Sequence, residues 1–124
     1  MSDMKEENSK YKDLVVWQKS MTFANDVINV VETLNTTRYH YRLCEQLEAA
    51  STSIPMNIAE GKGRNTNKEF IRFLHIARGS LYESLTLLEL FKMRNWLSEE
   101  NFDQLEKQSN EIGRMINGLI RSIS

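Results

Sequence analysis

The sequence predicts an all-α fold, an antiparallel up-down-up-down four-helix bundle. Apolar residues recur at alternating steps of three and four along four long segments, which is the spacing of one helix face. The 124 residues include only one proline and five glycines, so few positions interrupt regular structure. No segment alternates between apolar and polar residues as a half-buried strand does. We therefore expect a flexible N-terminal tail at residues 1–12 and one bundle domain at residues 13–124.

Two apolar stripes run side by side along the first predicted helix, which Asp13 can cap and which ends at residues 35–37. One neighbouring helix cannot cover so wide an apolar surface. We therefore expect this helix to contact two elements or another subunit. The first stripe comprises Leu14, Trp17, Met21, Ala24, Ile28 and Val31, and the second comprises Val16, Phe23, Val27, Val30 and Leu34.

The second predicted helix begins near residues 38–40 and contains the single proline, Pro55. Proline removes one backbone donor and crowds the carbonyl of the preceding turn, so we expect a kink there. The hydroxyls of residues 51–53 are placed to satisfy the freed backbone groups. Gly61 and Gly63 are expected to end the helix, and a helix that breaks at Pro55 and restarts is the alternative.

The third predicted helix opens with Thr66 or Asn67 as its cap and runs to about Asn95, and Ser98 caps the fourth. Glu83 stands between leucines on a very apolar stretch, so we expect a semi-buried carboxylate that is hydrogen-bonded or ion-paired. The seams of the second, third and fourth helices are Leu43, Leu47, Ala50 and Ile54; Phe70, Leu74, Ala77, Leu81, Leu85 and Leu88; and Phe102, Leu105, Ser109, Ile112, Ile116, Leu119 and Ile123.

Composition narrows the classes of function and location. The net charge of −1 provides no global field for nucleic acid or membrane. A single cysteine, Cys44, forms no internal disulfide and fits a reducing compartment. Residues 1–12 lack the apolar core of a signal peptide, and no apolar run approaches the roughly 20 residues that span a bilayer. We expect a cytoplasmic protein without a membrane partner.

Catalytic and metal-binding patterns are weak. His40, Cys44 and Glu48 share one helix face, but a structural zinc site needs four ligands and usually several thiolates. Neither His40 nor His75 follows a glutamate by three residues, as di-iron bundles require. The turn at residues 61–66 lacks the spacing of a phosphate-binding loop and follows a helix instead of a strand. We therefore expect no enzyme, cofactor, metal or small-molecule substrate.

The middle of the chain is locally basic. Residues 36–64 carry a net charge of +1 and residues 65–97 carry +2, whereas the flanking segments 13–35 and 98–124 each carry −2. Such a cluster is able to contact phosphates of nucleic acid or another anion. A solvated face with ion pairs is the alternative. The candidate contact residues are Lys62, Arg64, Lys68, Arg72 and Arg78.

Several motifs in order resemble one known family. The run Ser-Ile-Pro-Met-Asn-Ile-Ala-Glu-Gly occupies residues 53–61, with Gly63 and Arg64 after it. Upstream, Leu-Val-Val-Trp-Gln-Lys occupies residues 14–19; downstream, Lys-Glu-Phe occupies residues 68–70 and Phe-Leu-His-Ile-Ala-Arg-Gly-Ser occupies residues 73–80. This pattern resembles the bacterial four-helix bundle family whose founding members are encoded in intervening sequences of large-subunit ribosomal RNA genes. Its motif residues here are Trp17, Pro55, Asn57, Glu60, Gly61, Gly79 and Glu83.

The resemblance implies a left-handed bundle that assembles into a ring, commonly a homopentamer. Relatives include the accessory variability determinant proteins of diversity-generating retroelements, which engage a reverse transcriptase and nucleic acid. For this chain it implies a non-enzymatic oligomeric binding or scaffold protein, associating with structured RNA or a ribonucleoprotein. The wide apolar faces of the first and third helices agree with assembly, because exposed stripes of that size seek partners.

The sequence departs from the family pattern at one place. Where the family usually has two arginines after Gln46-Leu47, this chain has Glu48 and Ala49. The exchange removes two positive charges and adds one negative charge. A protein–protein interaction module that binds no nucleic acid therefore stays open as the alternative function.

Overall fold

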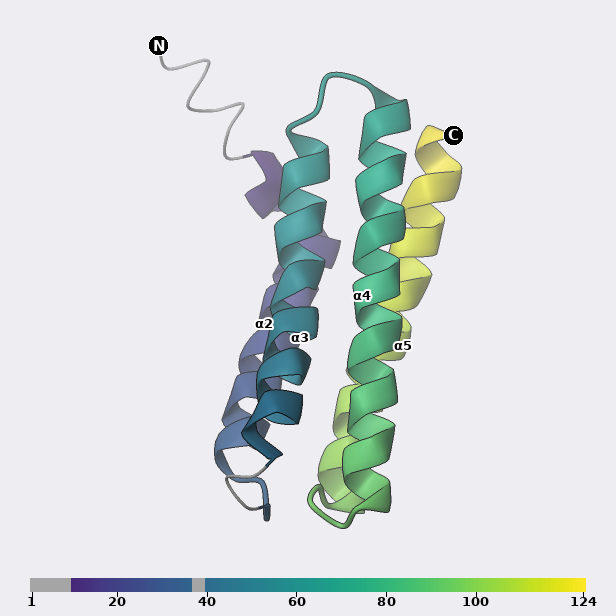
Figure 1. Ribbon diagram of the computed structural model, residues 1–124. Coiled ribbons are helices and arrows are strands. Elements are labelled where there is room, and N and C mark those ends of the chain that lie inside the picture. The colour runs from purple at the N-terminus through teal and green to yellow at the C-terminus, as the bar shows by residue number, and fades with distance from the viewer. Residues whose placement is uncertain (1–9, 37–39) are drawn as a thin grey trace.

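The computed structural model describes residues 10–36 and 40–124, which form one short 3-10 helix and four long α-helices (Figure 1). The described part of the chain contains no strand, so the all-α prediction is confirmed. The elements are η1 (Lys10–Asp13), α2 (Val15–Glu32), α3 (Tyr41–Lys62), α4 (Asn67–Met93) and α5 (Glu99–Ile123).

The four long helices occupy the corners of a square around one core. α3 packs on α2 and α4, and α5 closes the square by packing on α4 and α2. α2 lies diagonally opposite α4 across the core. Figure 1 shows the chain descending along α2, rising along α3, descending along α4 and rising along α5. The left-handed sense of the bundle stays a prediction.

The core follows the predicted seams, and the first helix contacts two elements, α3 and α5, as its two stripes predict. Val16, Phe23 and Val27 of the second stripe are buried, whereas in the first stripe Ala24 is buried and Met21 is exposed. Apolar burial of this kind supplies most of the free energy of folding. The largest fully buried side chains are Phe23, Leu47, Ile54, Ile58, Leu74, Leu81, Leu88, Phe91, Phe102, Leu105, Ile112 and Ile116.

The start of α2 differs from the prediction. Asp13 does not cap α2, because it belongs to η1, and Leu14 is the N-cap residue without a side-chain hydrogen bond. Tyr11 anchors this turn: its carbonyl accepts from the Leu14 N–H at 3.1 Å, and its ring packs edge-on against Trp17 at 5.2 Å. Residues 10–12 are therefore helical although they belong to the segment predicted as a tail, and residues 1–9 lie outside the described residues.

α3 is one continuous helix through Pro55, so the alternative of a helix that breaks and restarts is wrong. The predicted kink is not tested by this continuity and stays a prediction. Pro55 has no N–H to donate to the carbonyl of Ser51. The hydroxyls of Ser51 and Thr52 do not replace this donor, because both donate to the carbonyl of Glu48, one turn earlier. Two residues of the predicted start of this helix, 38 and 39, lie outside the described residues.

The caps of the last two helices agree with the prediction. Thr66 Oγ1 accepts from the Glu69 N–H at 3.2 Å, and Ser98 Oγ accepts from the Asn101 N–H at 3.1 Å. The turn between α4 and α5 depends on Asn95, whose φ of 62° lies in the left-handed region. Asparagine tolerates this conformation, which lets the Trp96 N–H bond back to the Phe91 carbonyl at 3.0 Å and close the helix end.

Candidate functional site

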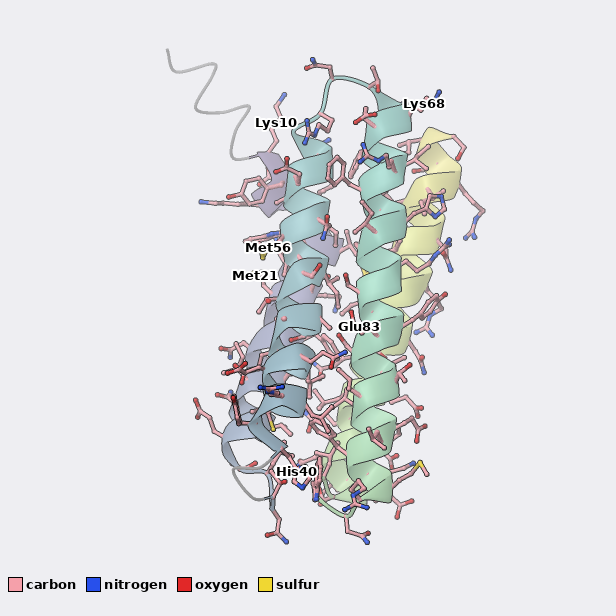
Figure 2. The ribbon with its side chains drawn as sticks, in the orientation of Figure 1. Lys10, Met21, His40, Met56, Lys68 and Glu83 are labelled. Carbon is pink, nitrogen blue, oxygen red and sulfur yellow. The ribbon has the colours of Figure 1, made fainter. Side chains whose placement is uncertain are left out.

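Four cationic side chains gather where α3 turns into α4, at one end of the bundle. Lys62 ends α3, Arg64 lies in the turn, and Lys68 and Arg72 occupy the first two turns of α4. All four residues are exposed. Figure 2 shows Lys68 at this end of α4, far from His40 at the opposite end. We call these four residues the basic end.

The half-buried ring of Phe73 organises two of the four cations. The guanidinium carbons of Arg64 and Arg72 lie 4.8 Å and 5.4 Å from its centroid, within cation–π range. Arg64 also pairs with Glu60 at 2.6 Å, and Arg72 pairs with Glu69 at 3.5 Å. Each guanidinium is thus fixed on two sides while remaining open to solvent.

Gly61 brings the helices close enough for this arrangement. A Cβ atom at residue 61 would lie 2.6 Å from the Cβ of Phe73 and 3.0 Å from the ring of Phe70. The prediction that Gly61 stops the helix is wrong, because Gly61 is buried inside α3 and Gly63 is the C-cap residue. Gly61 is needed because no side chain fits between α3 and α4 here.

Arg78, the fifth predicted contact residue, does not belong to the basic end. It lies on the side of α4 that faces α5, where its guanidinium donates to Asn117 Oδ1 at 2.8 Å. The same group lies 2.8 Å from His75 Nδ1. Arg78 is only half exposed and has a structural role in joining α4 to α5.

Two further motif residues, Asn57 and Glu83, take part in hydrogen bonds at the contact between α3 and α4. Asn57 donates from Nδ2 to the carbonyl of Ser53 at 2.8 Å and to its hydroxyl at 2.9 Å. That hydroxyl meets Ser80 Oγ across the helix pair at 2.8 Å. Glu83 accepts from Gln46 Nε2 at 3.3 Å, so its hydrogen bond was predicted correctly, but the predicted burial is wrong because the residue is exposed.

A second surface, which the sequence did not predict, is an apolar groove of about 380 Å³ between α2 and α3. Met21 and Met56 flank it and lie side by side in Figure 2. They are 46 % and 67 % exposed. The first stripe of the first helix supplies part of the lining of this groove. The groove could not be predicted, because it also requires knowing that α2 packs beside α3. This α2–α3 groove is lined by Tyr11, Trp17, Met21, Ala24, Asn25, Ile28, Thr52, Pro55, Met56 and Ala59.

The outward face of α4 is the third notable surface. Four large apolar side chains stand exposed along it. Their spacing of three to eight residues keeps them on one side of the helix. Gly79 lies among them, also exposed. We call this set the α4 ridge; it comprises Ile76, Gly79, Tyr82, Leu90 and Met93.

The opposite end of the bundle holds a wider, polar depression of about 580 Å³ beside the α4–α5 turn. Trp96 lines it and packs against His40 at 4.4 Å and Phe91 at 5.2 Å between ring centroids. His40 therefore packs on a residue that lines this depression. The described residues include no group of three or more histidine, cysteine or acidic side chains arranged for a metal ion.

Cys44 is half-buried near the start of α3. Burial, and secondarily the negative charge of Glu48, raise the pKa of its thiol. A raised pKa leaves the thiol protonated and a poor nucleophile near neutral pH. Within the described ranges, no helix is both long and apolar enough to cross a membrane.

Comparison with known proteins agrees with this architecture. The family model described as 23S rRNA-intervening sequence protein matches residues 12–118. A crystal structure from Bacteroides thetaiotaomicron, of a protein of unknown function from the S23 ribosomal protein family, is similar with a TM-score of 0.80. That protein is 27 % identical, and the match covers 86 % of this chain and 98 % of that one. The comparison with curated proteins gave no match. The four-helix fold and the match over most of the chain together show that this protein belongs to the 23S rRNA-intervening sequence protein family.

Proposed function

We propose that this protein is a non-enzymatic scaffold that self-associates and binds structured RNA through its basic end. The observation that carries the RNA half is the pair Arg64 and Arg72, both fixed on the ring of Phe73. A guanidinium that is already held in place loses less side-chain entropy when it binds a phosphate or stacks on a base. Lys62 and Lys68 add charge without an acidic partner among the described residues.

The charge of the basic end is modest in one copy. Glu60 and Glu69 offset two of its four positive charges and leave a net charge of +2. Self-association multiplies this patch, because each copy of an assembly contributes its own basic end. The two halves of the proposal therefore support each other. In the ring that the family resemblance implies, five copies would present five basic ends.

The names of the relatives mention ribosomal RNA or the ribosome and name no ligand. The family is described by the intervening sequence of 23S rRNA, and the similar structure comes from a family described as S23 ribosomal. Both descriptions refer to the ribosome or its RNA, so a structured RNA is the first ligand to test.

The test measures binding of a stem-loop RNA by fluorescence anisotropy over a series of salt concentrations. The quadruple variant Lys62→Gln, Arg64→Gln, Lys68→Gln and Arg72→Gln should bind more weakly and with a shallower salt dependence. The slope of log K against log salt falls by about 0.7 to 0.9 for each phosphate contact that is lost. Binding of the wild-type protein should tighten steeply as salt is lowered.

A matched control separates the basic end from overall charge. The variant Arg42→Gln, Arg94→Gln, Lys107→Gln and Arg114→Gln removes the same charge from exposed sites away from the α3–α4 turn. It should retain most of the affinity. Equal losses in both variants would contradict a localised site, and a wild-type protein that binds no RNA at low salt would refute the RNA half.

A protein–protein interaction module without nucleic acid is the second candidate. The α2–α3 groove favours it, because an apolar groove between two helices fits the apolar face of a third helix. Purification from native lysate with and without nuclease distinguishes the two candidates. Under the RNA proposal, the co-purifying material is sensitive to ribonuclease; under the second candidate, it is protein and resists the nuclease.

A further inference from the structure

We infer that the RNA bound at the basic end continues onto the neighbouring side of the bundle, where it contacts Arg78 of α4 and Arg121 of α5. Together with His75 these residues form a second cationic surface, which we call the α4–α5 strip. The inference rests on the proposed RNA binding and deepens it, because it names the path of the RNA beyond the α3–α4 turn.

The two helix segments that carry the α4–α5 strip contain no acidic side chain. Residues 70–82 of α4 and residues 112–123 of α5 include four arginines and neither aspartate nor glutamate. The two helices pack against each other, so their charges add on one side of the bundle. A cluster of one sign raises the local potential and attracts a polyanion.

The acidic residues that border these segments are engaged with other helices. Glu83 of α4 accepts from Gln46 of α3 at 3.3 Å, and Glu111 of α5 pairs with Lys19 of α2 at 3.0 Å. Within the described ranges, no acidic side chain forms an ion pair with an arginine of the α4–α5 strip. The charge of this strip is therefore not offset by the chain itself.

Arg78 is held in place without being neutralised. Its guanidinium donates to Asn117 Oδ1 at 2.8 Å and lies 2.8 Å from His75 Nδ1. Because a guanidinium only donates, Nδ1 is the acceptor and the ring proton lies on Nε2. The guanidinium has further N–H donors and is half exposed, so it is able to bind a phosphate in the position that it already occupies.

Arg121 lies beside this group because α4 and α5 run in opposite directions. Figure 1 shows α4 descending and α5 rising, and the bond between Arg78 and Asn117 fixes their register. Arg121, one turn after Asn117, is therefore level with the turn of α4 that holds His75. Its exposed guanidinium extends back along α5, since Nη2 would lie 3.9 Å from a Cβ atom at Gly118.

The α4–α5 strip is continuous with the basic end. Lys68, Arg72 and His75 are all exposed and follow one another at steps of four and three, which keeps them on one face of α4. The helix rises by about 15 Å from Lys68 to Arg78. Phosphates follow one another at about 3.4 Å along one strand of a duplex, so this distance spans several of them. The continuity favours one extended RNA over a separate anion as the ligand.

Removal of the two arginines tests the path of the RNA. In the stem-loop anisotropy assay, the double variant Arg78→Gln and Arg121→Gln should bind several-fold more weakly than the wild type. The slope of log K against log salt should fall by about 0.7 to 0.9 for each lost contact. The single variant Arg121→Gln should show part of this loss with an unchanged denaturation midpoint, because Arg121 is exposed and lies outside the bond between Arg78 and Asn117.

A matched control removes the same charge from the same side of the chain. The double variant Lys107→Gln and Arg114→Gln alters exposed residues of α5 that lie further from the basic end. It should retain the affinity and salt slope of the wild type to within the loss of one weak contact. An equal loss in the two double variants would show an effect of overall charge and would overturn the inference.

Photo-cross-linking locates the RNA independently of affinity. Two variants carry Cys44→Ser and one new cysteine labelled with benzophenone, either Gly118→Cys beside Arg121 or Asn110→Cys two turns earlier on α5. The label at residue 118 should cross-link to the stem-loop RNA in several-fold higher yield than the label at residue 110. Equal yields would contradict the path.

The outcomes separate the inference from the proposed function. If the quadruple variant of the basic end loses RNA binding while the double variant Arg78→Gln and Arg121→Gln binds like the wild type, the inference is wrong and the basic end stands. If the wild-type protein binds no RNA at low salt, both fail. If the double variant binds RNA normally but loses binding to phosphatidylserine vesicles, the strip belongs to a membrane contact and the inference is wrong.

Discussion

The α-hydrogens of Gly61 occupy a gap between α3 and α4 that no side chain fits. This one position sets the distance between the two helices, and that distance places Phe73 under the guanidinium groups of Arg64 and Arg72. A residue that binds nothing itself thus positions the residues that are proposed to bind RNA.

Gly61→Ala should destabilise the fold by about 1–3 kcal/mol, because the new methyl group overlaps the backbone-proximal atoms of Phe73. Urea denaturation followed by circular dichroism measures the loss. Gly118→Ala is the matched control, since a Cβ atom there meets only the flexible end of Arg121 at 3.9 Å. Equal midpoints for Gly61→Ala and the wild type would contradict the close approach.

Cys44 should react slowly with iodoacetamide near neutral pH. Burial and the charge of Glu48 disfavour the thiolate and raise the pKa, so less thiolate is present than in the unfolded chain. Glu48→Gln removes the repulsion and should speed alkylation at a fixed pH. The stability linked to this thiol is fully present below the pKa of the unfolded chain and is lost as pH rises through the folded pKa. Alkylation as fast in the native protein as in urea would refute the assignment.

At the scale of elements, local sequence rules account for the caps and the seams. Thr66 and Ser98 were predictable because an N-cap needs only a side-chain oxygen before a periodic run. The 3-10 helix and the left-handed turn at Asn95 were not, because they depend on Tyr11 packing on Trp17 and on Trp96 closing the core. Tertiary contacts, and not local sequence, therefore determine the 3-10 helix and the turn at Asn95.

Ser98→Ala should cost about 1 kcal/mol, because the Asn101 N–H at the start of α5 loses its acceptor. Ser122→Ala is the matched control within the same helix. Its hydroxyl only bonds back to the Leu119 carbonyl in the last turn, so its removal should be nearly neutral. Thermal denaturation compares the two. A larger loss in the control would contradict the capping role.

The candidate site was predictable in part. The four residues of the basic end lie close together in sequence around one turn, so the chain path alone places them at one end of the bundle. Arg78 lies apart from the other four because six residues beyond Arg72 the helix has turned it towards α5, and its contact with an anion stays a prediction. The α2–α3 groove and the exposure of the α4 ridge required knowing which helices are neighbours, which periodicity alone does not reveal.

At the scale of the whole molecule, three surfaces have separate roles. The basic end is proposed to bind RNA, and the α2–α3 groove and the α4 ridge are apolar surfaces available for the proposed self-association. Both apolar surfaces lie along the sides of the bundle, whereas the basic end lies at its tip, as Lys68 in Figure 2 shows. Assembly through the sides therefore leaves the tips accessible, so a scaffold of this shape is able to assemble and bind at once.

Self-association is the central claim, and the molar mass of the protein in solution tests it most directly. Size-exclusion chromatography with light scattering, repeated over a range of concentrations, compares that mass with the 14.5 kDa of one chain. For the wild-type protein, the account predicts an integral multiple of this mass, which is five chains in the ring that the family resemblance implies. For the variant Tyr82→Glu, which places a charge on the α4 ridge, it predicts a smaller species. A mass of 14.5 kDa at every concentration would contradict it.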